Sequence, residues 1–191
     1  HQSEIWPYEY ENMNANKSCR KSDVPAKVLK KFAGFLCGPL TEIINNCIQS
    51  GTWPDYLKHE FVTPIPKIPN PKVLDDLRNI SGLLNINKVM EKVTSKWIIS
   101  DMQAKMDPAQ FGNRKGVSIQ HYLVKMFDEI LKQLDKNSHG EAVAAILTMI
   151  DWKEAFPRQD PTLAIQSFIN NGVRPSLIPI LMSFFENRRM T

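Results

Sequence analysis

The chain has 191 residues, of which 42% are hydrophobic and 23% charged, and its net charge is +4. This composition is ordinary for a soluble globular protein with one domain, or with one domain and part of another. The longest apolar run has about nine residues, well short of the ~20 that span a bilayer, so no membrane partner is expected. Three cysteines without CxxC spacing argue against a disulfide framework or a zinc site.

The N-terminal part is polar and then becomes helical. Residues 1–21 are rich in Asn, Lys and Ser and are predicted to be a linker or a loosely docked tail. A helical period follows, with Ser22 or Asp23 as a possible cap and Gly51 as the stop signal. Gly-Pro at 38–39 interrupts this period, which predicts two helices or one sharp kink.

A strand and two helices are predicted next. Residues 60–66 start as a strand whose prolines favour a sheet edge, and 67–84 are predicted to be loop and short strand. The helix period returns over 85–102, and Asp-Pro at 107–108 marks a turn. A further helix is predicted over 118–134, with its apolar stripe packed in the core.

The C-terminal part contains the most apolar segment of the chain. Residues 142–151 are predicted to be a buried strand that ends on Asp151. Helices are expected over 160–172 and 175–187, and 188–191 resembles the start of a strand. Strands interleaved with helices predict an α/β or α+β class that is mostly helical before the apolar strand.

Asp151 is the first candidate for chemistry, because a carboxylate that follows a buried strand lies at the rim of a sheet. Mg²⁺ prefers oxygen ligands and usually keeps several waters beside substrate phosphates, so this position favours a metal ligand. An aspartate that only caps the next turn is the alternative. The letters WKEAF follow, and their last residue, Phe156, could equally be a core aromatic.

Two cations precede the apolar strand. Lys67 ends the run TPIPK, and Arg78 lies in LRNIS. Arginine offers a bidentate fork and lysine a point charge to a phosphate. The alternatives are a solvated loop lysine and an arginine that pairs locally with Asp75 or Asp76.

Residues 110–116 (QFGNRKG) combine two glycines with two cations. Glycine lets the backbone approach a ligand closely. Arg114 and Lys115 can reach phosphate, and a helix start at Ser118 offers N–H groups to an anion. A basic loop before a helix is the alternative.

Taken in this order, TPIPK with LRNIS, QFGNRKG and DWKEAF resemble the fingers and early palm of a reverse transcriptase, most closely of the non-LTR retrotransposon type. The resemblance covers roughly residues 22–191. It implies a right-hand polymerase fold that is helix-rich and truncated. A linker or tail would occupy 1–21, the fingers 22–140 and the beginning of the palm 141–191.

The resemblance also implies a role for each segment. Asp151 would be the catalytic carboxylate and, with the backbone carbonyl of Trp152, would ligate Mg²⁺, or Mn²⁺ in its place. Phe156 would pack under the sugar of the incoming nucleotide and disfavour a 2′-OH. Lys67 and Arg78 would close over the triphosphate. The template strand would be supported by Gln110, Gly112, Arg114 and Lys115.

The activity implied for the whole enzyme is RNA-directed DNA polymerisation. Its partners would be an RNA template, a DNA primer and deoxynucleoside triphosphates, in the nucleus or in a cytoplasmic ribonucleoprotein. No YxDD-type motif occurs before Thr191, so we expect this chain alone not to polymerise DNA. A truncated palm sheet would expose an apolar edge that favours self-association. The alternative function is a non-catalytic RNA- or DNA-binding module with a reverse-transcriptase-like fold.

Overall fold

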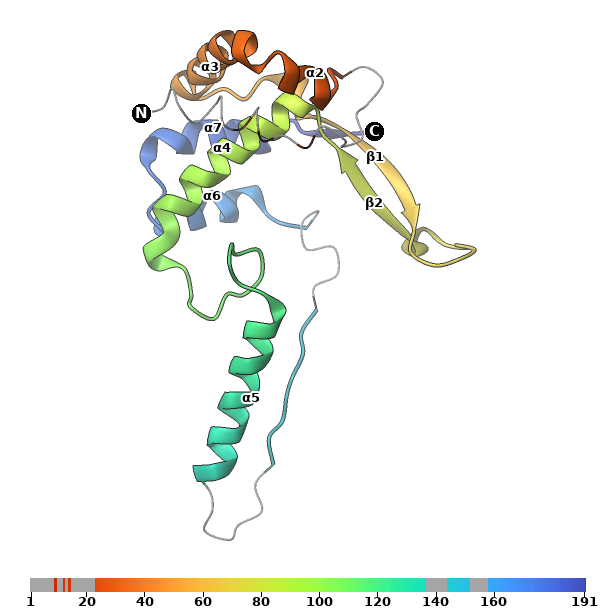
Figure 1. Ribbon diagram of the computed structural model, residues 1–191, viewed down its shortest axis with the longest axis vertical. Helices are drawn as coiled ribbons and strands as arrows, with labels where there is room; N and C mark the ends of the chain where they lie inside the picture. The colour runs from red at the N-terminus through yellow and green to blue at the C-terminus, as the bar shows by residue number, and fades with distance from the viewer. Residues whose placement is uncertain (1–8, 10–11, 13, 15–22, 137–143, 152–157) are drawn as a thin grey trace. The chain divides into compact units, whose positions relative to one another are not determined.

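The computed structural model describes residues 9, 12, 14, 23–136, 144–151 and 158–191. They form a helix-rich α+β fold with one mixed three-stranded sheet of order β2-β1-β3, which confirms the expected class (Figure 1). The helices are α2 (Ala26–Lys31), α3 (Ala33–Ser50), α4 (Asn85–Met102), α5 (Ile119–Lys136), α6 (Pro161–Asn170) and α7 (Ile178–Phe185). The strands are β1 (His59–Pro66), β2 (Leu77–Gly82) and β3 (Arg189–Met190), and the short 3-10 turns are Asp55–Lys58, Leu74–Asp76, Gln103–Lys105 and Pro175–Leu177.

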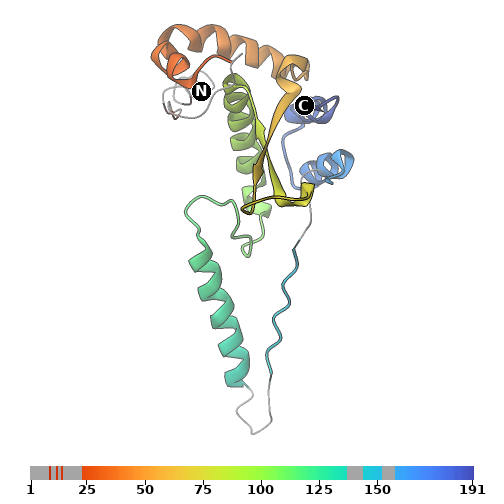
Figure 2. The same ribbon diagram turned by 90° about the vertical axis from the view of Figure 1, so that its right-hand side faces the viewer.

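The chain divides into two compact units. Unit 1 comprises residues 1–102 and 160–191, and it contains the sheet and all the described helices except α5. Unit 2 comprises residues 103–159. Within unit 2, α5 and the extended segment 144–151 run in opposite directions, as both Figure 1 and Figure 2 show. The expected boundary between fingers and palm at residue 140 stays a prediction.

Helices from both parts of unit 1 enclose its core. Apolar residues of α2, α3, α4 and α7 are buried against one another and around Trp53, which is only 1% exposed. The Trp53 indole N–H donates to Asn87 Oδ1 at 3.1 Å, and the Trp53 backbone N–H donates to Ser183 Oγ at 2.9 Å. Its ring meets the Phe184 ring edge-on at 4.7 Å. The core members are Leu29, Ala33, Cys37, Ile44, Trp53, Val89, Met90, Val93, Val173, Leu177, Ile180 and Leu181.

Several helix ends follow the sequence signals. Gly51 ends α3 with φ +66°, a left-handed conformation that glycine adopts without steric cost. Asp160 Oδ1 accepts from the Thr162 N–H at 2.7 Å, so it caps α6 as predicted. The predicted strand start near the C-terminus is confirmed by β3, which pairs in parallel with His59 and Glu60 of β1.

Two local predictions in the first helical region were wrong. Asp23 does not cap α2, because its carboxylate accepts from the Asn85 N–H at 2.8 Å at the start of α4. The helix is not interrupted at 38–39 but at Phe32, and α3 continues through Pro39. Pro39 has no N–H, so the carbonyl of Phe35, four residues earlier, lacks its helical donor. Phe35 is 83% exposed, so water can hydrogen-bond to this carbonyl.

The buried strand predicted at 142–151 is absent from residues 144–151, the part of it that the structure describes. They have no regular secondary structure, and Ile146 and Met149 are 90% and 86% exposed. A strand needs a neighbour to hydrogen-bond its N–H and C=O groups, and no described strand pairs with this segment. Self-association through a palm edge stays a prediction.

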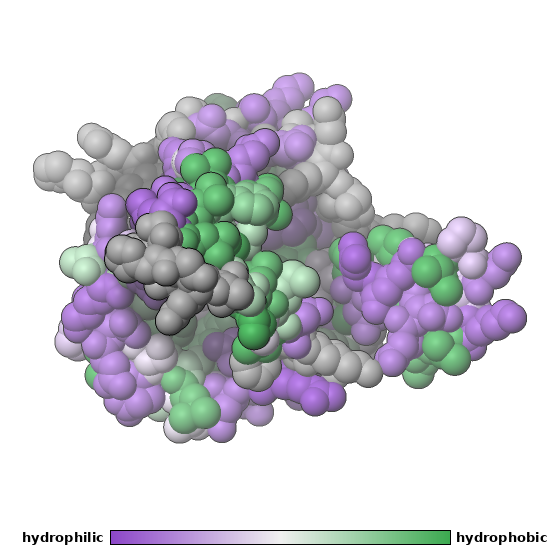
Figure 3. Space-filling view, turned by 90° about the horizontal axis from the view of Figure 1, so that it is seen from below, coloured by the Kyte–Doolittle hydropathy of each residue, from purple (hydrophilic) through white to green (hydrophobic). Residues whose placement is uncertain are grey.

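The apolar stripe of α5 is also not buried as predicted. Ile119, Phe127 and Leu131 are among its exposed side chains. The face shown in Figure 3 has hydrophobic side chains at the surface. No other α-helix is described in unit 2, so no described helix of that unit covers the stripe. None of the helices that the structure describes has the length and hydrophobicity of a membrane span.

Ion pairs connect the middle and the C-terminal end of α4 to other parts of unit 1. Near its middle, Lys92 and Lys96 pair with the buried Glu9 carboxylate; burial opposes ionisation of Glu9, but the two lysines outweigh it and lower its pKa. At its end, the Asp101 carboxylate accepts from Arg174 Nε at 2.7 Å, Nη2 at 2.5 Å and the backbone N–H at 3.0 Å. The Arg174 side chain and then its backbone N–H lower the pKa of Asp101 to about 2.

We predict that Gly51→Ala and Gly34→Ala change stability in opposite directions. An added Cβ at Gly51 would lie 2.6 Å from Pro179 Cβ at a positive φ, so the free energy of unfolding should fall by about 2 kcal/mol. Gly34 lies within α3 and its Cβ would meet no atom within 4 Å, so alanine should add about 0.5–1 kcal/mol. Urea denaturation of both variants measures the two changes, and equal changes would contradict the close contact at Gly51.

Asp101→Asn should cost on the order of 1 kcal/mol at neutral pH, since Arg174 is partly exposed and screened by water. The folded-state pKa of Asp101 is about 2, below its unfolded value, so the carboxylate stabilises the fold above about pH 4. The difference from the parent chain should vanish as pH falls from about 4 to 2. Urea midpoints across this range test it. The control is Asp128→Asn on α5, whose ion pair with Lys132 is exposed, so its effect should be much smaller than that of Asp101→Asn.

Candidate functional site

The β1–β2 hairpin carries the two cations predicted to bind a triphosphate. The strands pair antiparallel, with Ile65 opposite Arg78 and Pro66 opposite Leu77. Side chains alternate along a strand, so Lys67, two residues after Ile65, lies on the same face as Arg78. The hairpin therefore presents both cations on one face.

Asp76 organises the end of this hairpin. The ladder extends one residue past β1, because the Lys67 N–H donates to the Asp76 carbonyl at 2.8 Å. The Asp76 carboxylate accepts from the N–H groups of Lys72 at 2.8 Å and Val73 at 3.1 Å. These two hydrogen bonds lower the pKa of Asp76, and the charge of Lys67 adds a smaller effect.

The local ion pairs considered for Arg78 are not formed. Asp76 is occupied by backbone N–H groups, and Arg78 makes no ion pair with any residue that the structure describes. Lys67 Nζ donates to the backbone carbonyl of Asp75 at 2.8 Å, not to a carboxylate. Both cations are exposed, so their charges are available to an anion.

The predicted template segment is a hydrogen-bonded loop of unit 2. It begins with a turn in which the Gln110 N–H donates to the Asp107 carbonyl at 3.0 Å. Arg114 Nη1 donates to the carbonyls of Asp107 at 3.5 Å and Gln110 at 3.3 Å, and Gln110 Nε2 donates to the Gly112 carbonyl at 3.2 Å. Arg114 thus holds the loop together, whereas Lys115 is exposed.

Aromatic contacts attach this loop to the start of α5. The rings of Phe111 and Tyr122 meet edge-on at 5.7 Å, and Lys125 Nζ lies 5.7 Å from the centre of the Phe111 ring. At the helix start, the Ser118 N–H donates to His121 Nδ1 at 3.0 Å. One of the N–H groups predicted to face an anion therefore already has a partner.

Asp151, the predicted metal ligand, is exposed at the end of the extended segment. Trp152 and Phe156 lie outside the described residues. Mg²⁺ demands near-octahedral oxygen coordination, of which one carboxylate supplies only a part. Among the residues that the structure describes, no group of three or more His, Cys, Asp or Glu side chains is placed to hold a metal ion. The described residues alone therefore do not form a complete magnesium site.

The structure brings the predicted residues together in two sets. Lys67 and Arg78 share the hairpin of unit 1. Gln110, Gly112, Arg114 and Lys115 share one loop of unit 2, the unit that also contains Asp151. The reverse-transcriptase resemblance also implies that Lys67 and Arg78 face the same cleft as Asp151, and this stays a prediction.

The sequence analysis missed a polar cluster on the core side of α4. Arg188 pairs with the buried Glu60, and its guanidinium lies 4.1 Å from the centre of the Phe184 ring. Glu91 Oε1 accepts from Asn87 Nδ2 at 3.0 Å and lies 3.8 Å from Arg188 Nη2. The available signal was the spacing of Asn87 and Glu91, which lie four residues apart on a helix and so share a face.

Burial raises the pKa of Glu91 to about 7, against smaller opposing effects of the hydrogen bond from Asn87 and the charge of Lys88. A carboxyl with this pKa exists in both protonation states near neutral pH. The charge of Glu91 can therefore respond to a ligand near neutral pH.

No protein-family model matches this chain, and no curated protein is significantly similar to it in sequence. Its function is therefore inferred from its residues and their geometry.

We predict that Asp76→Ala loosens the end of the hairpin. Removing the carboxylate leaves the N–H groups of Lys72 and Val73 without their acceptor, so their amide hydrogens should exchange with solvent about tenfold faster. Asp75→Ala is the control, because it keeps the backbone carbonyl that Lys67 uses. Hydrogen exchange followed by NMR measures both, and unchanged exchange at Lys72 and Val73 would contradict the role of Asp76.

Proposed function

We propose that this chain is the fingers region and the beginning of the palm of a reverse transcriptase of the non-LTR retrotransposon type. The whole enzyme would be an RNA-directed DNA polymerase that adds deoxynucleotides to a primer 3′-OH. The observation that carries the proposal is the β1–β2 hairpin, because its register puts Lys67 and Arg78 on one exposed face. That arrangement supports the triphosphate role implied by the sequence motifs.

A triphosphate concentrates negative charge, and it is bound best by cations that are not already paired. Among the described residues, Arg78 makes no ion pair and the Lys67 ammonium group donates to a backbone carbonyl. Arg78 would engage two phosphate oxygens through its fork, and Lys67 would add a point charge. In this proposal the hairpin holds the nucleotide.

The loop 110–116 would support the template strand. Its geometry favours different roles for its two cations, since Arg114 is used to hold the loop and Lys115 is exposed. Lys115 would contact a template phosphate, and Gly112 would let the backbone approach the strand. When bound, Mg²⁺ would polarise the phosphoryl group, with Asp151 as one ligand.

A non-catalytic nucleic-acid-binding module is the second candidate. It is favoured by the absence of a complete metal-binding group among the described residues, while the cationic loop remains. Such a module would bind an RNA–DNA duplex with a steep dependence on salt. Its affinity for the duplex would not depend on a nucleotide.

The test is binding of a fluorescent RNA–DNA primer–template duplex to the 191-residue chain, with and without dATP and Mg²⁺. We expect dATP to tighten binding of the parent chain. The double variant Lys67→Ala/Arg78→Ala should lose about tenfold in apparent dATP affinity, because each of these exposed cations contributes up to about 1 kcal/mol to a charge pair. Its affinity for the duplex without dATP should change less than about twofold.

Lys72→Ala is the matched control, since Lys72 is an exposed lysine of the same hairpin. Its dATP affinity should equal that of the parent chain. An effect of Lys72→Ala as large as that of the double variant would refute a specific nucleotide site. Duplex binding that no nucleotide alters, with a steep salt dependence, would instead establish the non-catalytic module.

A further inference from the structure

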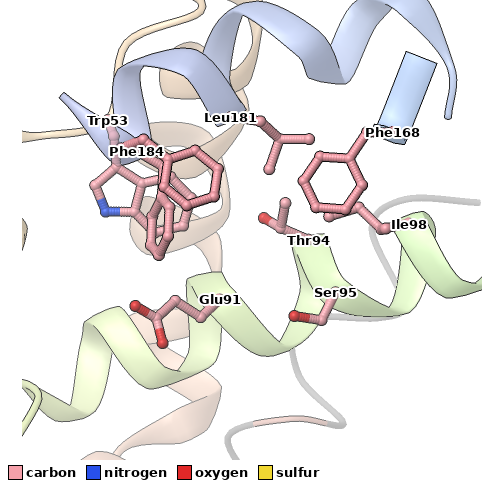
Figure 4. A pocket seen from close by; sticks show the side chains of 9 residues that line it. Trp53, Glu91, Thr94, Ser95, Ile98, Phe168, Leu181 and Phe184 are labelled. Carbon is pink, nitrogen blue, oxygen red and sulfur yellow. The ribbon is translucent and has the colours of Figure 1, made fainter. Parts of the chain in front are cut away.

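A pocket of about 190 Å³ lies within unit 1, between α4, α6 and α7 (Figure 4). Glu91, Thr94, Ser95 and Ile98 extend into it from α4, opposite Phe168, Leu181 and Phe184 (Figure 4). The remaining lining residues are Trp53 and Phe185. Four aromatic rings and one carboxyl thus converge on a single small space.

The pocket is large enough for a small organic molecule. A cavity of about 150 Å³ with an apolar lining admits benzene, so this pocket can hold an aromatic ring and a short substituent. Its lining is mainly hydrophobic with a few converging polar groups, which is typical of a ligand site. The Thr94 hydroxyl already donates to the Met90 carbonyl at 2.9 Å, so Glu91 and Ser95 are the polar groups left for a ligand.

One oxygen of the Glu91 carboxyl can accept a hydrogen bond from a ligand. Its contacts with Asn87 and Arg188 are both made by Oε1. Among the residues that the structure describes, Oε2 has no hydrogen-bond partner. A carboxylate oxygen that is partly shielded from water gains most from a hydrogen-bond donor carrying positive charge.

The charges around Glu91 favour a cation as well. Arg188 is paired with Glu60, so those two charges cancel, and ionised Glu91 leaves the group with a net charge of −1. Lys88, one turn earlier on α4, donates to Asn85 Oδ1 at 3.1 Å. Burial raises the pKa of Glu91 to about 7, so a cation that favours its ionised form would bind more tightly as pH rises through 7.

We infer that this pocket binds a small organic cation, with an ammonium group on Glu91 and an apolar body of about benzyl size among the aromatic rings. Phe168 and Phe185 line the same pocket, and aromatic side chains are the usual lining of sites for ammonium ligands. The site is independent of the hairpin cations Lys67 and Arg78. It can therefore exist whether or not the polymerase proposal holds.

The probe is benzylammonium chloride, titrated into the ¹⁵N-labelled chain and followed by NMR. We expect a saturable shift of the assigned Trp53 indole N–H and of the amides of α7 that line the pocket. Binding should be about fivefold tighter at pH 8 than at pH 6, because Glu91 ionises in this interval. Benzyl alcohol, a neutral molecule of similar shape, should bind at least about fivefold more weakly at pH 8.

Glu91→Gln keeps the acceptor for Asn87 but removes the charge, so it should weaken benzylammonium binding about tenfold. Glu42→Gln, at an exposed position of α3, is the matched control and should leave the affinity within about twofold. If circular dichroism shows that Glu91→Gln does not fold, the inference is tested by comparing benzylammonium and benzyl alcohol binding to the parent chain. Equal binding of the two molecules, or no shift of the Trp53 indole, would overturn the inference.

Discussion

Unit 1 depends on one requirement, which is that the indole of Trp53 be buried without losing the hydrogen bond of its N–H. Asn87 meets that requirement from α4, and its own side-chain amide then donates to Glu91. Burying one aromatic ring therefore draws an amide and a carboxyl toward the core. Arg188 and Glu60 extend the same polar network to the sheet. The Glu91 carboxyl thus lies at the pocket because it accepts the hydrogen bond of Asn87, the residue that accepts from the Trp53 indole.

The prolines of β1 keep the hairpin two-stranded. Beyond Val62, the only described strand that pairs with β1 is β2, because Pro64 and Pro66 have no N–H to offer to another strand. The same residues stop the sheet from growing at this edge. Lys67 and Arg78 stand on a face of this two-stranded part and are exposed.

The sequence predicted elements whose signals are local. The bounds of α4, the stop at Gly51 and the cap at Asp160 all follow from periodicity and backbone chemistry within a few residues. It failed where a distant partner decides the outcome. Asp23 caps a helix that starts about sixty residues later, and the apolar segment 144–151 has no described strand to pair with.

In the candidate site, too, features with local sequence signals could be predicted and features that depend on distant residues could not. The cationic positions of the hairpin and the loop could be found from their motifs, because charge type and spacing are written in the sequence. The environment of Glu91 could not, since burial raises its pKa and the α7 residues that line the same pocket lie about ninety positions later in the chain. Unit 1 is completed by the C-terminal part of the chain. That part supplies β3, which pairs in parallel with β1, and four core residues from Val173 to Leu181. During synthesis, α2 to α4 leave the ribosome with eight of the twelve core residues, and closure of unit 1 has to wait until the chain has passed through all of unit 2.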